Sequence, residues 1–249
     1  MMKRVAVLSD IHAVLPALEA TLAEPDVRDA DKIVVTGDIA AGPQPVETLD
    51  ALSALGERVV WVSGNGEREL IESRQGKDIK IPDPIAPWAA EQLRDDQLEL
   101  LTRMPKTARL RVDGLGEVLF CHATPRDDEE VALVDSRVAR WDEVLGGLDA
   151  DVDAVVCGHT HMPYVRTVRG VLIANPGSVG MPYGRAGAHW ALLGPGVALR
   201  RTEFDYDDAC ARVAAESGYA DAAAWADEYV RARNSDVDAL AVFGPMDGR

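Results

Sequence analysis

The sequence has little cysteine, little positive charge and no long hydrophobic run, and each shortage excludes a class of protein. Its 249 residues include three cysteines, too few for a disulfide framework. Cys121 and Cys157 lie in apolar runs, so we expect them to be buried as small hydrophobic side chains in a reducing compartment. No apolar stretch approaches the roughly 20 residues that span a bilayer, and the first residues do not form a signal peptide. We therefore expect a cytoplasmic protein with no membrane partner.

Positive charge is scarce, because 26 lysines and arginines stand against 42 acidic residues, giving a net charge of −16. A surface this acidic repels the phosphates of nucleic acids, which argues against general nucleic acid binding. A small phosphate ester can still bind where cations in the site reverse the local field. Hydrophobic residues make up 47% of the chain, a fraction typical of globular proteins that bury a substantial core.

The first third of the chain alternates short apolar runs with helical patterns. Strands are predicted over residues 5–8, 33–35 and 59–62, and helices over residues 15–22 and 46–55. Such strand–helix–strand repeats are typical of a largely parallel sheet covered by helices. The stretch 75–87, with Pro82, Pro84 and Pro87, breaks this pattern and leads into short helices. We expect this part to be a lid or an oligomer contact.

The part after Pro105 is rich in strands. Strands are predicted over 108–112, 118–121, 154–157, 164–168, 171–174, 190–193 and 197–204, with helices over 136–145, 206–216 and 220–232. The simplest arrangement is an α/β (α+β) fold in which two mixed β-sheets face each other in a four-layer sandwich flanked by helices. We expect one domain over residues 1–249, with a small helical lid or insert at about 75–104. The C-terminal helices, at about 206–233, are expected to pack on the core or to form a homo-oligomer face.

Metal-ligating side chains follow the predicted strands at the points where each strand ends. They are Asp10, His12, Asp38, Asn65, His122, His159 and His161. Ligands of sheets with parallel strands bind beyond the carboxyl ends of those strands, so we expect these side chains to meet at one edge of the fold. Asp10 and His12 are two residues apart, as are His159 and His161, and in extended backbone such pairs project to one side. Imidazole, carboxylate and amide ligands without thiolate favour Mn, Fe, Zn, Co or Ni over a structural zinc.

None of these motifs is sufficient by itself. An Asp-x-His pair usually means a turn or a satisfied polar pair, and Gly37-Asp38 after a strand is commonly a turn or a helix cap. Gly158-His159-Thr160-His161 is moderately specific. The motifs occur together, in order, each after its own strand, and this joint occurrence favours a metal site.

The series Asp10-Ile11-His12, Gly37-Asp38, Gly64-Asn65, His122 and Gly158-His159-Thr160-His161 resembles the calcineurin-like metallophosphoesterase superfamily. Asn175-Pro176-Gly177-Ser178-Val179-Gly180 and Phe204-Asp205-Tyr206 also resemble its compact bacterial and archaeal members. The resemblance covers residues 4 to about 206, and its motifs are specific as a set. It implies two facing sheets flanked by helices.

The resemblance also implies a centre of two divalent metal ions, with manganese the first expectation. One ion would be held by Asp10, His12, Asp38 and His161, and the other by Asp38, Asn65, His122 and His159. Asp38 would bridge the two, and a bridging hydroxide would attack phosphorus in line. Asp38, Asn65 and His122 are the residues of this set that we expect to be catalytic.

One position departs from the family pattern. The family usually has a histidine after the asparagine of its Gly-Asn motif, thought to protonate the leaving oxygen, whereas this chain has Gly66. A missing general acid costs roughly 10²–10⁴ in rate when the leaving group is poor, and little when it is already acidic. We therefore expect phosphodiester or nucleotide-type substrates rather than alkyl monoesters.

Four further residues are candidates for substrate binding: Arg126, Arg185, Ser178 and Glu67. The two arginines could bind phosphate through two hydrogen bonds, although surface arginines are common. Ser178 is expected to support the metal-bearing loops or to line the pocket. Glu67 could replace the missing acid, but its simpler role is to stabilise a helix N-terminus. His189, outside the motifs, is expected to pack rather than to bind metal.

Two other functions remain open on the same scaffold. A protein serine/threonine phosphatase is the nearest alternative, although phosphoserine is a poor leaving group and Gly66 offers it no acid. A non-catalytic interaction scaffold is the other alternative, and its signature would be lost metal ligands. All seven ligand positions are intact, which favours hydrolysis of a small phosphate ester.

Overall fold

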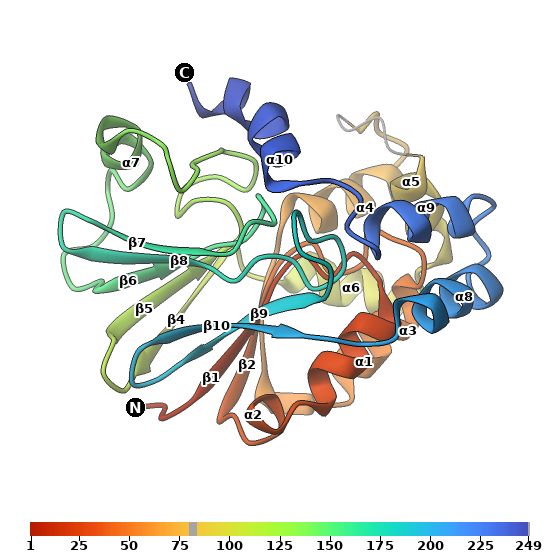
Figure 1. Cartoon of the computed structure of the whole chain (residues 1–249), viewed down its shortest axis with the longest axis horizontal. Helices are drawn as coiled ribbons and strands as arrows, with labels where there is room; N and C mark the ends of the chain where they lie inside the picture. Colours follow the sequence, from red (N-terminus) through yellow and green to blue (C-terminus); the bar gives the residue numbers. More distant parts are fainter. Residues whose placement is uncertain (80–83, 249) are drawn as a thin grey trace.

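The computed structural model describes residues 1–79 and 84–248, and in this part of the chain two five-stranded sheets pack face to face (Figure 1). The strand order is β10-β9-β1-β2-β3 in the first sheet and β4-β5-β6-β8-β7 in the second. The strands are β1 (Val5–Leu8), β2 (Lys32–Thr36), β3 (Val59–Val62), β4 (Thr107–Val112), β5 (Gly116–Cys121), β6 (Ala154–Val156), β7 (Tyr164–Val168), β8 (Val171–Asn175), β9 (Ala188–Leu193) and β10 (Val197–Thr202). Both sheets are mixed, as predicted.

Helices cover the outer faces of the two sheets. They are α1 (Leu15–Ala23), α2 (Pro25–Arg28), α3 (Pro45–Ser53), α4 (Asn65–Arg74), α5 (Ile85–Gln92), α6 (Asp95–Arg103), α7 (Val138–Val144), α8 (Tyr206–Glu216), α9 (Ala222–Tyr229) and α10 (Asp236–Phe243), with short 3₁₀ turns η1 (Gly56–Arg58) and η2 (Gly244–Asp247). Most of them lie over the first sheet, on the right of Figure 1, while α7 lies beside the second sheet on the left. The predicted four-layer arrangement is therefore confirmed.

The alternation of side chains along each strand explains the layers. In β1, Val5 and Val7 pack between the sheets, where they meet Phe120 and Val156 of the second sheet. Ala6 and Leu8 point the other way and join the core under the helices. Because β1 has buried side chains on both faces, it appears in the sequence as an uninterrupted apolar run.

The predicted strands match the observed ones to within a few residues, and most of the helices are also found. The segment predicted as a lid contains α5 and α6, and Pro82 lies outside the described residues. Ile85, Ala89 and Ala90 of α5 are buried in the core under the first sheet. No range was predicted for α2, α4 or α10, and the last strand was expected to reach Phe204, whereas β10 ends at Thr202.

The parallel pairs of each sheet set the position of the candidate site. In the first sheet β1, β2 and β3 run parallel, and in the second β5, β6 and β8 do. Their carboxyl ends lead into the loops that carry the predicted ligands. No helix in the described ranges is long and apolar enough to cross a membrane.

Candidate metal centre

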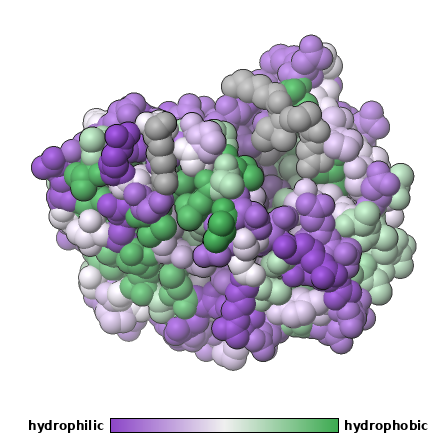
Figure 2. All heavy atoms as spheres, turned by 45° about the horizontal axis from the view of Figure 1, so that its top comes forward, coloured by the Kyte–Doolittle hydropathy of each residue, from purple (hydrophilic) through white to green (hydrophobic). Residues whose placement is uncertain are grey.

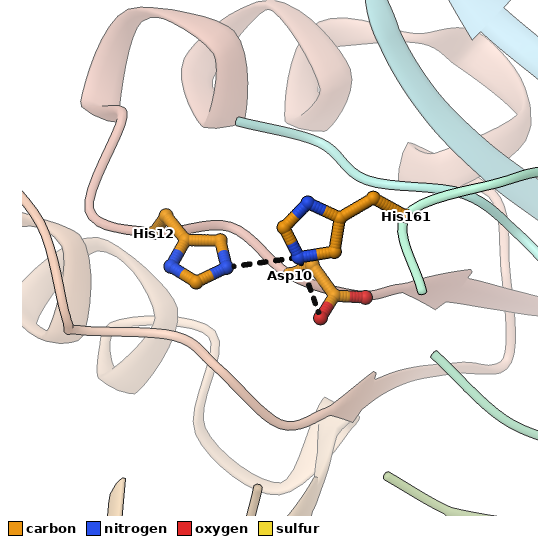
Figure 3. Close-up of side chains that lie close together, drawn as sticks. All are labelled: Asp10, His12 and His161. Atoms are coloured by element: carbon orange, nitrogen blue, oxygen red, sulfur yellow. Dashed lines mark hydrogen bonds and ion pairs between the residues drawn. The ribbon is translucent and has the colours of Figure 1, made fainter. Parts of the chain in front are cut away.

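The first group of ligands joins the loop after β1 to the loop after β6 (Figure 3). One ligand atom from each of Asp10, His12 and His161 lies within 4.8 Å of the others. Nε2 of His161 is 3.3 Å from Oδ1 of Asp10 and 3.1 Å from Nε2 of His12. All three are residues predicted as metal ligands, and they are brought together from segments about 150 positions apart in sequence.

The far nitrogens of the two rings in this group are held by the backbone. Nδ1 of His12 is 3.1 Å from the carbonyl oxygen of Ala41, and Nδ1 of His161 is 2.8 Å from that of Met181. With Nδ1 donating in both rings, the two Nε2 lone pairs face each other, a repulsive contact that a proton or a metal cation relieves. Such second hydrogen bonds to carbonyls are the usual way in which metal-binding histidines are oriented. The donor set therefore fits a divalent cation.

The second group consists of Asp38, His122 and His159, whose ligand atoms also lie within 4.8 Å of one another. His122 has its Nδ1 2.8 Å from the carbonyl oxygen of Thr36 and its Nε2 3.0 Å from Oδ1 of Asn65. Oδ1 of Asp38 lies 3.3 Å from Nε2 of His122. Its other oxygen, Oδ2, lies 3.8 Å from Nε2 of His12 in the first group. Asp38 is thus positioned between the two groups.

The electrostatics of the second group follow from burial and mutual charge. Burial alone would raise the pKa of Asp38, but the adjacent His122 outweighs it and lowers this pKa overall. Burial alone would lower the pKa of His122, and Asp38 raises it to about 10. Burial and the neighbouring His122 lower the pKa of His159 to about 4. Asp38 is therefore ionised and His159 neutral, the forms in which these side chains bind metal, whereas His122 is protonated and would release a proton on binding a cation.

Comparison with known proteins adds an independent line of evidence. Residues 2–194 match the family model for the calcineurin-like phosphoesterase superfamily domain. The chain belongs to this superfamily. An uncharacterised protein of Methanocaldococcus jannaschii is 27% identical over 204 residues, which cover 72% of this chain and 76% of that protein.

Other proteins are similar to this chain over part or most of its length. A symmetrical bis(5'-nucleosyl)-tetraphosphatase of Aliivibrio fischeri is 29% identical over 49% of this chain and 54% of its own length. Among solved structures, a hypothetical protein of Pyrococcus horikoshii has a TM-score of 0.78 at 20% identity, over 94% of this chain and 100% of its own. A metallophosphoesterase of Sphaerobacter thermophilus has a TM-score of 0.68 at 24% identity, over 91% of this chain and 99% of its own. These two structures share the fold.

The backbone of the ligand loops differs from the sequence expectation. We expected extended backbone to direct Asp10 and His12 to one side, but both have left-handed backbone, with φ of 53° and 47°. Asp38, His159 and His161 also have positive φ, at 52°, 66° and 56°. Residues other than glycine adopt this conformation at a cost of roughly 1–2 kcal/mol each. Asp10 and His12 do lie in one group, whereas His159 and His161 belong to different groups, and the geometric reason given for the pairing was wrong.

Gly66, where the superfamily usually has histidine, lies directly against Asp38. Its N–H donates to Oδ1 of Asp38 at 2.7 Å. A Cβ atom at this position would lie 2.8 Å from the same oxygen, closer than real Cβ atoms approach. Gly66 therefore lets the N-terminus of α4 touch the carboxylate that lies between the two groups of ligands.

Glu67 and Ser178 are fully buried. Glu67 accepts hydrogen bonds from the N–H groups of Asp38, Ile39 and Gly64 at 2.7–2.8 Å, so it ties the loop after β2 to the start of α4. Ser178 donates to the carbonyl oxygen of Asp10 at 2.6 Å and accepts from the N–H of Met181. These contacts fit the supporting roles expected for both side chains, while direct substrate binding by either stays a prediction.

The two arginines lie in different places. Arg126 lines a small cavity together with His122, but its guanidinium pairs with Glu130 and Glu143. Arg185 is exposed and lines a separate cavity of about 590 Å³. His189 lines that cavity too, and its Nε2 lies 2.8 Å from the carbonyl oxygen of Arg185. The structure therefore places His189 outside both groups of ligands, while phosphate binding by the arginines stays a prediction.

Two residues that the sequence reasoning missed lie beside the ligands. Glu69 and Trp225 line a cavity of about 80 Å³ whose walls also include His12, Asp38 and Asn65. Burial, followed by the charge of Asp38, raises the pKa of Glu69 to about 7. The spacing of Glu69 one helical turn beyond Asn65 and Gly66 is the one sequence signal that could have indicated it. No local signal places Trp225 near residues 12 and 38.

Proposed function

We propose that this protein is a binuclear metal-dependent phosphoesterase that cleaves phosphodiesters or nucleotide-type substrates. The observation that carries the proposal is the pair of ligand groups, Asp10–His12–His161 and Asp38–His122–His159, with Asp38 between them. Asn65 completes the second group, because its Oδ1 lies 3.0 Å from Nε2 of His122. Manganese is the ion that we expect first, and a small phosphate ester is the expected partner.

When bound, two divalent cations supply an activated water as the nucleophile and neutralise the charge of the phosphate. The protein's own residues fix the geometry for this chemistry. Hydrogen bonds from Nδ1 to backbone carbonyls orient His12, His122 and His161. The N–H of Gly66 and the carboxylate of Glu67 hold the side chain and the backbone of Asp38 in place. This preorganised frame is what allows charge developing on phosphorus to be stabilised without rearrangement.

The contact between Gly66 and Asp38 supports substrates with an acidic leaving group. A Cβ atom at position 66 would lie 2.8 Å from Oδ1 of Asp38, so the usual histidine would require this carboxylate to move, and glycine itself supplies no acid. Cleavage then depends on a leaving group that departs without a proton, such as an aryloxide or a phosphate. The partial similarity to a bis(5'-nucleosyl)-tetraphosphatase agrees with this, because phosphoanhydrides have such leaving groups.

The test is a set of rate measurements with manganese on an aryl phosphodiester, an alkyl phosphomonoester, a phosphoserine peptide and a dinucleoside polyphosphate. Wild type, Asp38→Ala and the exposed control Asp95→Asn are compared. We expect activity on the diester or the polyphosphate, lost in Asp38→Ala and kept in the control. Full activity of Asp38→Ala would refute the bridging role. A strong preference for the phosphoserine peptide would favour the protein phosphatase, and inactivity on every substrate would favour the interaction scaffold.

A further inference from the structure

Two aromatic side chains lie against the metal centre, one beside each group of ligands. The ring of Tyr183 is centred 6.0 Å from that of His161, in the first group. The ring of Phe243 is centred 5.8 Å from that of His159, in the second group. The two aromatic rings also meet each other edge to face, with their centroids 6.2 Å apart. Tyr183 and Phe243 therefore form one surface, here called the aromatic wall, that borders both groups.

The two rings of the aromatic wall come from separate parts of the chain. Tyr183 lies in the loop between β8 and β9, two residues after Met181, whose carbonyl oxygen holds Nδ1 of His161. Phe243 is the last residue of α10, which lies at the top of Figure 1 and beyond the residues 2–194 that match the family model. The motifs that supply the metal ligands therefore do not account for the wall.

Neither ring of the aromatic wall is fully buried. The ring of Phe120 between the sheets is completely shielded from solvent, as is usual for a core aromatic residue, whereas Tyr183 and Phe243 are only half-buried. Accessible apolar surface beside a polar site is typical of a place that a ligand covers. The accessible parts of these two rings therefore suit a ligand that is bound at the metal centre.

A large cavity lies on the Tyr183 side of the aromatic wall. It measures about 590 Å³ and is partly open to solvent, and Tyr183 is part of its lining. This volume is within the range of small-molecule sites. Met162, the residue after the ligand His161, also lines the cavity. Leu240, about one turn before Phe243 on α10, lines it too. Tyr183 thus contacts the metal centre and the cavity at once.

The charges in the lining of this cavity balance. Arg185 and Asp236, both exposed, are the charged side chains that the described part of the chain contributes to the lining. Burial lowers the pKa of His189, the histidine of the lining, and so favours its neutral form. Much of the remaining lining is apolar, as at Val134. A neutral apolar group is therefore favoured here over a second anionic one, which the net charge of −16 would also repel.

We propose that the aromatic wall is the subsite for a planar aromatic group of the phosphate ester, which packs on Tyr183 and Phe243 and extends into the cavity. The proposal rests on the proposed function, since the metal centre would hold the phosphate. Aromatic rings attract one another in offset or edge-to-face contact beyond the burial of their apolar area. Tyr183 and Phe243 are then specificity-determining residues that favour a nucleobase or another aryl group over a saturated group of the same size.

The test measures the binding of benzyl phosphate and cyclohexylmethyl phosphate by calorimetry in the presence of manganese. Both ligands carry one phosphate and a six-membered ring on the same linker, but only the first ring is aromatic. The wild-type protein is expected to bind benzyl phosphate roughly 3- to 10-fold more tightly. Thymidine 5′-phosphate and 2-deoxyribose 5-phosphate form a second pair. Tighter binding of the nucleotide in this pair identifies a nucleobase as the aromatic group, and a preference confined to the first pair identifies a smaller aryl group.

Variants assign the preference to the two rings. Tyr183→Leu and Phe243→Leu each replace a ring by an apolar side chain, so each should lower the ratio of the two affinities, and the double variant should bring it below about twofold. Tyr183→Phe keeps the ring without its hydroxyl and should retain the wild-type ratio. The control Tyr206→Leu removes a half-buried ring that pairs with Phe204 at the start of α8, and it should also retain the ratio.

Binding needs no turnover, so the subsite and the proposed function fail separately. A preference for benzyl phosphate that depends on Tyr183 and Phe243 supports the subsite even if no phosphate ester is hydrolysed, a result that would refute only the proposed function. Equal or undetectable binding of benzyl phosphate and cyclohexylmethyl phosphate by the wild-type protein would overturn the subsite. A preference that the double variant keeps would overturn the assignment of these two residues.

Discussion

Replacing Asp38 by asparagine should remove metal from both groups of ligands at once. Asp38 is 4% exposed, and its two oxygens lie 3.3 Å from His122 and 3.8 Å from His12. Asparagine keeps the shape of the side chain and an acceptor for the N–H of Gly66, which donates at 2.7 Å. The substitution therefore removes one negative charge while it preserves the local packing.

The size of the expected loss in kcat/KM follows from the number of metal ions that Asp38 would bind. Changes in the residues that merely support a metal ligand typically cost 10- to 100-fold in affinity or activity. Loss of a charged ligand shared by two ions should cost more, roughly 10³-fold in kcat/KM, or about 4 kcal/mol. Bound manganese, measured by elemental analysis after gel filtration, should fall from about two ions per chain to fewer than one.

Asp10→Asn is the matched comparison, because Asp10 belongs to the first group alone. It should keep about one ion per chain, held by Asp38, His122 and His159. Thermal unfolding gives a second readout, since a ligand at 100 times its Kd stabilises by about 2.7 kcal/mol, or roughly 5–10 °C in Tm for a chain of this size. This increase in Tm on addition of manganese should be absent in Asp38→Asn. Two bound ions and a wild-type Tm increase in Asp38→Asn would refute this reasoning.

Three further predictions concern the frame around the site. Glu67→Gln turns an amide NH₂ towards backbone N–H donors of Asp38, Ile39 or Gly64. The free energy of unfolding, measured by urea titration, should therefore fall by about 1–3 kcal/mol. An unchanged urea midpoint would contradict this. Phe120→Ala empties a fully buried position between the sheets and should lower the free energy of unfolding by about 3–5 kcal/mol. A loss of stability under about 1 kcal/mol would show instead that the sheets close over the cavity. Phe243, whose ring lies 5.8 Å from that of His159, covers one side of the second group. Phe243→Ala should speed the extraction of one ion by EDTA without changing the number bound, and equal extraction rates would contradict the covering role.

The layers of the fold could be predicted from the sequence because its strands are short and apolar. Val5–Leu8 and Val59–Val62 are strands with the predicted bounds, since an uninterrupted apolar run leaves no polar residue that would make the limits ambiguous. The last helix was missed because Asp236–Phe243 is short and its alternating acidic and apolar residues do not resemble an amphipathic helix. Its start was nevertheless marked, because Ser235 and Asp238 form a capping box.

The candidate ligands could be predicted because the carboxyl ends of parallel strands meet at one edge. Their left-handed backbone could not be predicted, because positions 10, 12 and 38 are not glycines, the residues that usually indicate a positive φ. Trp225 belongs to the C-terminal helices, which were expected to pack on the core or to form a homo-oligomer face, and it is buried in the core under the first sheet. Its position in the same cavity wall as His12 depends on how α9 packs on α8 and on the core, which local periodicity does not determine.

Only the average polarity of the surface could be predicted from the sequence. Figure 2 shows a largely hydrophilic face, as the net charge of −16 suggests, with hydrophobic side chains gathered in one area of it. Val134, Val138, Val237 and Val242 are among the exposed large hydrophobic residues. The expected homo-oligomer and the cytoplasmic location stay predictions.

The central claim is that Asp38 bridges two metal ions. Anomalous diffraction at the manganese absorption edge, from crystals grown with manganese, tests it most directly. We expect two anomalous peaks roughly 3.5–4 Å apart, one contacted by Asp10, His12 and His161, the other by Asn65, His122 and His159, with a carboxylate oxygen of Asp38 on both. A single peak, or two peaks without Asp38 between them, would contradict it.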